Sequence, residues 1–238
     1  MRIPFVALIA ISFVVPAAAE WSPLLYAQQP GAQQPAASIT APPQTTATAV
    51  GDPAPLYSID ESEFRALTAG DESWYSVELP AEVRAWYRNP DGSCVQCSIG
   101  MCGADQNCRA AASLLWSSEF GPAVRGGSNP QRVAAYCNDP RRAIEAFNIT
   151  GEQTFAWMAW ACRNGRGAAI GAGTRHFQTL YGHNPERGLW AVCNNNSTSK
   201  IDIYSDEGFR WLHLASGRWC VVLDYPPHPR VATYRRWW

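Results

Sequence analysis

Five short apolar or alternating segments follow one another toward the end of the chain, and they limit the possible folds more than any other feature. Their sequences are AAIGAG, HFQTLYGH, LWAVCN, KIDIY and RWCVVLDY. Gly, Asn and Pro separate them, and segments of this length with such boundaries are typical of β-strands joined by turns. We therefore expect an antiparallel sheet, interrupted by one helix, SDEGFRWLHLA, with Ser205 as its cap.

The part of the chain before this sheet has mainly helical patterns. In SIDESEFRALTAG the spacing of Ser58 and Glu61 predicts a capping box, and in SNPQRVAAYC Asn129 and Pro130 predict a helix start. Two elements connect the two parts: a predicted strand, AIEAFNIT, and a predicted helix, GEQTFAWMAWACRNG. Helices first and strands later indicate an α+β domain over residues 56–238, with a cleft between a helical part and an antiparallel part.

The first 55 residues do not fit this domain. Residues 1–19 have one positive charge, an apolar run and small residues before Glu20, which is typical of a secretory signal peptide, although a retained anchor is the alternative. Residues 20–55 are rich in Pro, Gln, Ala and Thr, a composition that predicts a disordered linker. We expect a secreted or periplasmic protein that has no membrane contact once the signal peptide is removed.

The formal net charge of −1 and the lack of a basic run before the final YRRWW argue against a nucleic-acid partner. The chain has eight cysteines, and an even number in an exported protein favours disulfides. Three of the eight lie close together in the segment NPDGSCVQCSIGMCG, at Cys94, Cys97 and Cys102.

Cys94 has the sequence context of a nucleophile. Ser93 and Gln96 have capping-box spacing, so Cys94 is expected to be the first residue of a helix. Free N–H groups and the helix dipole at this position favour a thiolate. A thiolate that attacks a carbonyl also needs a proton acceptor and a group that orients the acceptor.

His176 is the histidine best placed for that role, because it begins the strand HFQTLYGH. The next strand ends in CNNNS, which brings Asn194 and Asn195 to the neighbouring strand end in an antiparallel pair. An Asn amide oxygen there would accept the imidazole N–H and select its tautomer. Alternatively, the three asparagines form only a turn, and His176 is only a strand residue.

These motifs resemble the papain-like cysteine peptidase superfamily. GSCVQCSIG is similar to its nucleophile motif, and HFQTLYGHNPERGLWAVCNNNS is similar to its His strand, turn and Asn strand. DGSCVQCSIG also resembles the ovarian-tumour-type branch, and a Gln six residues before Cys102 resembles the bacteriocin-leader-peptidase branch. The resemblance implies an exported thiol hydrolase for peptide or protein substrates that needs no metal or cofactor, with Cys94 as nucleophile, His176 as base and Asn195 as the orienting residue.

The sequence departs from that family at the oxyanion donor. The family has a Gln six residues before its nucleophile, but Arg88 lies six before Cys94. Asn89 and Gln96 are the remaining side-chain candidates for this donor. The Gly-Ser-Cys-x-x-Cys spacing also leaves Cys97 as an alternative nucleophile, with Cys94 as a disulfide partner, and Cys102 as a third choice.

Three other interpretations of the cysteines remain open. Cys94, Cys97, Cys102 and Cys108 would be a metal or iron–sulfur site of uncommon spacing. The C-x-x-C pair would be a redox site that lacks the usual preceding strand. Finally, the same fold with an inactive site and a Trp-lined cleft would be a disulfide-stabilised binding module.

Overall fold

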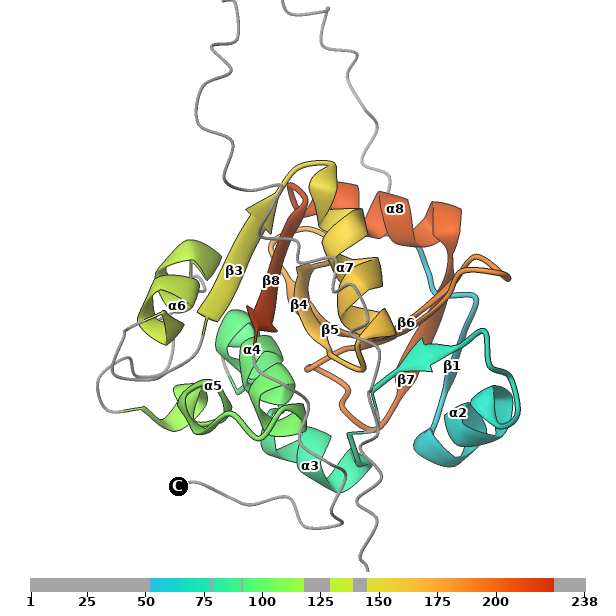
Figure 1. Ribbon diagram of the computed structural model, residues 1–238, viewed down its shortest axis with the longest axis horizontal. Coiled ribbons are helices and arrows are strands. Elements are labelled where there is room, and N and C mark those ends of the chain that lie inside the picture. Colours follow the sequence, from blue (N-terminus) through green and yellow to red (C-terminus); the bar gives the residue numbers. More distant parts are fainter. Residues whose placement is uncertain (1–51, 78, 91, 118–128, 139–144, 225–238) are drawn as a thin grey trace, which may run out of the picture. The chain divides into compact units, whose positions relative to one another are not determined.

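The computed structural model describes residues 52–77, 79–90, 92–117, 129–138 and 145–224 (Figure 1). All of them belong to a compact unit that spans residues 49–238. The signal peptide predicted for residues 1–19 and most of the linker predicted for residues 20–55 lie outside the described residues.

The strands of the described residues form one sheet in which every pair is antiparallel. The order is β1-β7-β6-β5-β4-β8-β3, and β2 pairs with β5. The strands are β1 (Tyr57–Ile59), β2 (Tyr75–Ser76), β3 (Glu145–Thr150), β4 (Ala168–Gly171), β5 (Phe177–Asn184), β6 (Leu189–Cys193), β7 (Ile201–Ser205) and β8 (Trp219–Asp224). This confirms the α+β class with an antiparallel sheet, and each of the five segments that were predicted as strands forms one.

The helices of the described residues lie mostly before β4, and α8 is inserted between β7 and β8. They are α2 (Glu61–Thr68), α3 (Ala81–Trp86), α4 (Cys94–Asp105), α5 (Arg109–Ala112), the 3₁₀ helix η1 (Leu114–Trp116), α6 (Pro130–Cys137), α7 (Gln153–Arg163) and α8 (Asp206–Ala215). Asn129 and Ser205 are the N-caps of α6 and α8, as predicted, and each side chain accepts a backbone N–H of the first turn.

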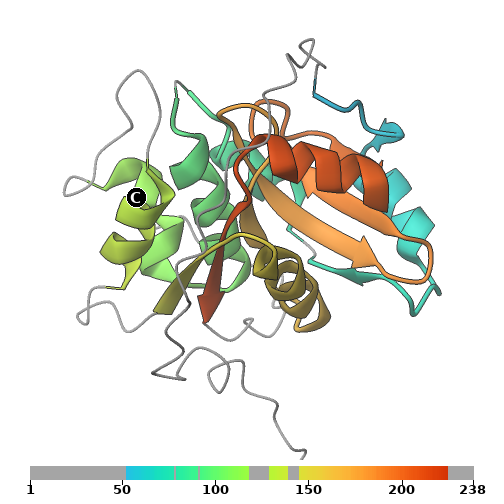
Figure 2. The same ribbon diagram turned by 90° about the horizontal axis from the view of Figure 1, so that it is seen from above.

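Helices cover both faces of the sheet (Figure 1, Figure 2). Neighbouring residues of a strand point to opposite faces. Ala169 of β4 and Val221 of β8 pack with α4 in one hydrophobic cluster. Ala168 and Val222 pack with α7 and α8 in another. Strands covered on both sides have no solvent-facing residues, which explains why every residue of β5 is buried.

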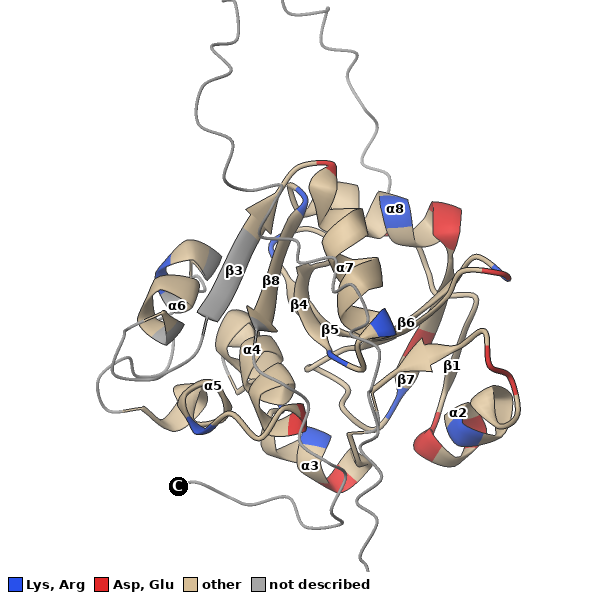
Figure 3. Cartoon of the chain, viewed as in Figure 1, with Lys and Arg blue, Asp and Glu red and all other residues tan. Residues whose placement is uncertain are grey.

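Helix α4 is the central helix of the domain. Every residue from Cys94 to Gly103 is buried, and Asp105 is its one charged residue (Figure 3). It contacts β4, β5 and β8 on one side and α3, α5, η1 and α6 on the others. A helix enclosed in this way has no polar stripe, so its sequence lacks the usual amphipathic period.

Several sequence predictions need correction. Asp60, and not Ser58, caps α2, and Asp60 forms the capping box with Glu63. Ser58 belongs to β1 and donates to Asp202 at 2.5 Å. The Ala- and Leu-rich segment RAAASLLWSSEFG, whose composition is typical of one helix, instead forms the two short helices α5 and η1 within its described residues. The strands β1 and β2 were not predicted, and they pair with β7 and β5 of the second half. The helical and β parts are therefore not separate along the chain.

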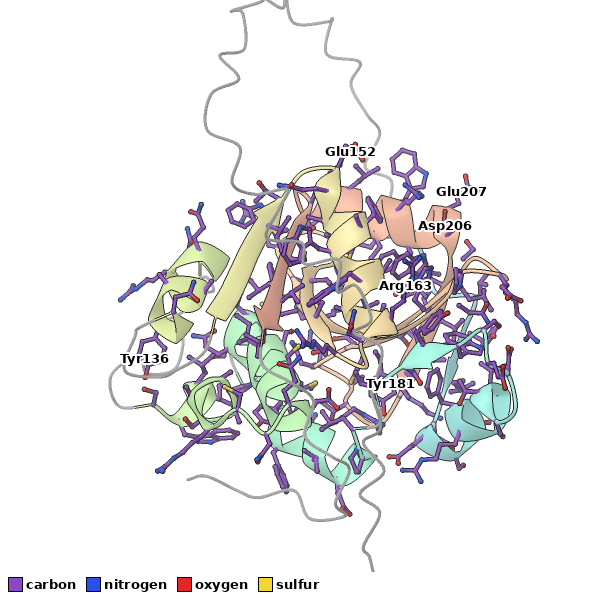
Figure 4. The ribbon with its side chains drawn as sticks, in the orientation of Figure 1. Tyr136, Glu152, Arg163, Tyr181, Asp206 and Glu207 are labelled. Carbon is purple, nitrogen blue, oxygen red and sulfur yellow. The ribbon has the colours of Figure 1, made fainter. Side chains whose placement is uncertain are left out.

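A stack of rings lies between β5, β6 and α8. His183 is stacked on Trp190 with ring centroids 3.8 Å apart, and Trp190 is stacked on Phe209 at 4.4 Å. His183 is 7 % exposed, and its Nδ1 atom has no hydrogen-bond partner among the described residues. Burial, followed by the nearby charge of Arg163, lowers the pKa of His183 to about 4, whereas Asp206 acts in the opposite direction. Figure 4 labels Arg163 at the end of α7 and Asp206 at the start of α8.

This buried histidine predicts acid sensitivity of the fold. Between pH 6.5 and about 4 the unfolded chain binds a proton at His183 and the folded chain does not, so stability falls as the pH falls through this range. The loss at pH 4.5 relative to pH 7 is expected to be about 2 kcal/mol from this group. Urea unfolding of the wild type and of His183→Phe, which keeps the ring stack, measures it. Equal pH dependence of the two proteins would contradict the assignment.

Candidate functional site

The start of α4 carries the predicted nucleophile. Cys94 is the first helical residue and Ser93 is the N-cap, as predicted, but the Ser93 side chain makes no capping hydrogen bond. Instead, the backbone N–H of Ser93 donates to Asn89 Oδ1 at 2.9 Å. The side chain that holds the helix start therefore comes from the preceding turn.

The environment of the Cys94 thiol combines burial with backbone donors. Cys94 is 6 % exposed, the largest exposure of any cysteine in the described core. Burial raises the pKa of its thiol, whereas hydrogen bonds from the backbone N–H groups of Phe177, Val95 and Cys94 itself act to lower it. The sequence predicted a thiolate at this helix start, but desolvation outweighs the N–H groups in the resting state.

His176 lies directly before β5, at the end of a tight hairpin from β4. The N–H of Ala172 donates to the His176 carbonyl at 3.0 Å. The hairpin uses left-handed backbone at Gly173 (φ 68°) and at Arg175 (φ 59°). A non-glycine residue rarely adopts this conformation, and such strain is often found beside functional residues.

Asn194, the first residue after β6, is the hydrogen-bond partner of His176. The distance between His176 Nε2 and Asn194 Oδ1 is 3.0 Å. An amide oxygen only accepts, so the imidazole proton lies on Nε2 and Nδ1 is left as the basic nitrogen. Asn194 Oδ1 also accepts the N–H of Asn196 at 2.9 Å, which holds the amide in this orientation.

Asn195, which the sequence analysis assigned to orient His176, has a different position. Its side chain is fully buried, and its Nδ2 atom lies 3.0 Å from the Cys94 carbonyl oxygen, 3.0 Å from Ser98 Oγ and 2.9 Å from the Phe177 carbonyl oxygen. Successive residues at a strand end point to opposite sides, so only one of two adjacent asparagines can reach the histidine. Asn194 faces His176, and Asn195 joins α4 to β5.

Cys94 contacts the residue that directly follows His176 in the chain. Phe177, the residue after His176, reaches the Cys94 sulfur through its N–H and the Asn195 amide through its carbonyl. The loop after β6 is in turn tied to the segment before α4, because the N–H of Asn89 donates to the Asn195 carbonyl at 2.8 Å. Three segments far apart in sequence therefore meet at the start of α4.

The two side chains expected to donate to an oxyanion do not lie free at this site. Asn89 uses its amide within the protein: Nδ2 donates to Asn196 Oδ1 at 3.0 Å, and Oδ1 accepts from Ser93. Gln96 is fully buried within the domain. The N–H of Cys97 makes the first backbone bond of α4, to the Ser93 carbonyl. The backbone N–H groups at Cys94 and Val95 are thus the donors that remain next to the thiol.

The other two cysteines of α4 are enclosed. Cys97 is fully buried, and burial raises the pKa of its thiol to about 12, with a further contribution from the Cys94 charge. The pKa of Cys102 is also raised well above its usual value by burial. The alternative nucleophiles are therefore less accessible than Cys94.

The disulfides expected from export are not seen where cysteine side chains are described. These seven cysteines are free thiols: Cys94, Cys97, Cys102, Cys108, Cys162, Cys193 and Cys220. The described residues also contain no group of three or more His, Cys, Asp or Glu side chains arranged to hold a metal ion.

The roles of Ser98 and of Asn89 in holding the start of α4 were not predicted from the sequence. Ser98 is one helical turn after Cys94, and this spacing was the available signal. For Asn194 and Asn195, the alternation of side chains along β6 predicts that the two side chains point to opposite sides. Which of them faces His176 depends on the strand register, in which Thr179 pairs with Cys193.

None of the described helices has the length and apolar character needed to span a bilayer. No model of a known protein family matches this chain, and the search of the curated proteins found no match either.

Proposed function

We propose that this chain is a papain-like thiol hydrolase that cleaves an amide bond of a peptide or protein substrate. Cys94 is the nucleophile, His176 is the proton acceptor and Asn194 orients His176. The observation that carries the proposal is the hydrogen bond of 3.0 Å between His176 Nε2 and Asn194 Oδ1, together with the contact between the Cys94 sulfur and the N–H of Phe177, the residue after His176. The chain order, with Cys at a helix start, His directly before a strand and Asn directly after the next strand, supports the same family.

In this mechanism the proton of Cys94 moves to His176 Nδ1 as the sulfur attacks the substrate carbonyl. The oxyanion accepts hydrogen bonds from backbone N–H groups at the start of α4. The imidazolium then donates its proton to the leaving amine, and an acyl-thioester remains on Cys94. Water, deprotonated by His176, hydrolyses the thioester, and the thiol is restored.

The composition of residues 1–55 supports a proposal for where this activity takes place. Residues 1–19 act as a signal peptide and residues 20–55 as a linker, so the enzyme works outside the cytoplasm, as a secreted or periplasmic protein. The substrate carbonyl must reach Cys94 at the start of α4. The reaction uses no metal, no cofactor and no nucleic acid.

A binding module with an inactive site is the second candidate. The small exposure of Cys94 and the effect of burial on its pKa favour this alternative, because both reduce its reactivity. The two candidates differ in whether His176 changes the reactivity of Cys94.

Iodoacetamide labelling between pH 6 and 8, followed by peptide mapping, tests this difference. For an enzyme, Cys94 is expected to react at least about tenfold faster than Cys97 or Cys102, which lie in the same tryptic peptide. His176→Ala should slow Cys94 labelling by about tenfold, and Asn194→Ala by a smaller factor, because removing the base has more effect than loosening it. His183→Phe is the matched histidine control and should leave the rate unchanged.

If Cys94 reacts no faster than its neighbours, or if His176→Ala has no effect, the binding module is correct. If the labelling pattern is as expected, peptide libraries with Cys94→Ser as the inactive control identify the substrate.

A further inference from the structure

Cys97 is a buried thiol that the proposed reaction does not use, and it lies one turn after Cys94 in the same helix. The two residues are the first and fourth of α4. Residues three apart in a helix are neighbours on one face, with Cα atoms about 5 Å apart, and this lies within the range that a disulfide spans. A small change in the first turn, where α4 begins, would bring the two sulfurs into bonding contact.

The two thiols differ in access. Cys94 is the more exposed at 6 %, and backbone N–H groups reach its sulfur, whereas Cys97 is fully enclosed. An oxidant from solvent therefore meets Cys94 first. A negative charge on Cys94 raises the pKa of Cys97, as expected for two neighbouring sulfur atoms.

Cys102 is a poor partner for Cys94. It is eight residues along α4, which places it about 12 Å further along the helix axis. Its environment includes Asp105 and Cys162 near the other end of the helix. Along α4, only Cys97 is close enough to link to Cys94.

We propose that Cys94 and Cys97 are a redox-modified pair in which Cys97 resolves the oxidised form of Cys94. The Cys94 thiolate attacks a hydroperoxide, the O–O bond breaks, and Cys94 becomes a sulfenic acid. The leaving oxygen takes up the proton that the thiol had lost and departs as water or an alcohol. The Cys97 sulfur then attacks the Cys94 sulfur, the hydroxyl group leaves as water with the Cys97 proton, and a disulfide forms. A dithiol reductant reverses the last step by exchange.

This pair would protect the site from irreversible oxidation, because a sulfenic acid that forms a disulfide does not proceed to sulfinic acid. The disulfide itself depends only on the two thiols. Its effect on activity rests on the proposed function, since it would remove the nucleophile reversibly.

Mass spectrometry after treatment with hydrogen peroxide tests the pair. Trypsin releases residues 89–109 as one peptide that contains Cys94, Cys97, Cys102 and Cys108. The folded full chain is oxidised, free thiols are blocked, and the peptide is fragmented. We expect the loss of two hydrogen atoms, no fragment ions from cleavage between residues 94 and 97, and full reversal by dithiothreitol.

Dimedone, which traps sulfenic acids, gives the complementary result. Its adduct at Cys94 should be at least about tenfold more abundant in Cys97→Ser than in the wild type. Cys102→Ser, a matched change at another buried thiol of α4, should still form the link. A wild-type peptide that carries dimedone or sulfinic acid at Cys94 without the link would overturn the proposal, as would a link to Cys102 or Cys108.

The fragmentation experiment uses the wild-type protein, so its result stands even if a variant fails to fold. The result is also independent of hydrolysis. If the disulfide forms but His176→Ala leaves Cys94 labelling unchanged, only the hydrolase proposal is refuted. The His176 effect without a disulfide refutes the redox pair alone.

Discussion

Asn195→Ala is expected to destabilise the folded domain by about 3 kcal/mol, because a buried amide whose two N–H hydrogens are shared among three surrounding acceptors is lost and a cavity remains. The acceptors are the carbonyl oxygens of Cys94 and Phe177 and the hydroxyl of Ser98. The change removes the bridge between the start of α4 and the start of β5. It should therefore also loosen the thiol relative to His176 and slow Cys94 labelling.

Two further variants make this result specific. Asn195→Asp has nearly the same shape but directs a carboxylate at oxygen acceptors, so it should be at least as destabilising as the alanine. Asn164→Ala is the control, because that exposed side chain makes one hydrogen bond, to the Trp160 carbonyl at 2.8 Å, and should cost less than about 1 kcal/mol. Urea unfolding at pH 7 measures all three. Equal effects of Asn195→Ala and Asn164→Ala would show that Asn195 is not a structural bridge.

Gly103→Ala is the second change with a large expected effect. A Cβ atom at Gly103 would lie 2.6 Å from Ala111 Cβ and would also meet the backbone nitrogen of Ala112. Backbone does not move as a flexible side chain does, so α4 and α5 would have to separate. We expect a loss of about 3 kcal/mol despite the better helix propensity of alanine.

Gly208→Ala in α8 is the matched control for this helical glycine. Its Cβ would meet Ser205 Oγ at 3.3 Å and no backbone atom of the remainder of the domain. Its stability should change little or increase slightly, because alanine favours helix. Thermal unfolding of both variants distinguishes the effects. A Gly103→Ala protein as stable as Gly208→Ala would mean that α4 and α5 are not in close contact in solution.

Local sequence patterns predicted those elements whose signals lie within a few residues. Asn129 before Pro130 and Ser205 before α8 are caps in the structure because a cap involves only its own first turn. The cap of α2 was displaced by two residues because Ser58 and Asp60 are both good caps, and Ser58 is instead paired through β1 with β7. β1 and β2 are too short to carry a period of their own, and only pairing with distant strands defines them.

The sequence by itself determined the antiparallel strands, the helix that begins at Cys94 and the position of His176 before β5. All of these depend on short-range alternation, turn residues and capping. Only the tertiary structure decided which asparagine faces His176, since that depends on the register of β6 against β5. It likewise decided that burial raises the pKa of Cys94, because the loss of solvent around a thiol comes from α4 being enclosed by segments distant in the chain.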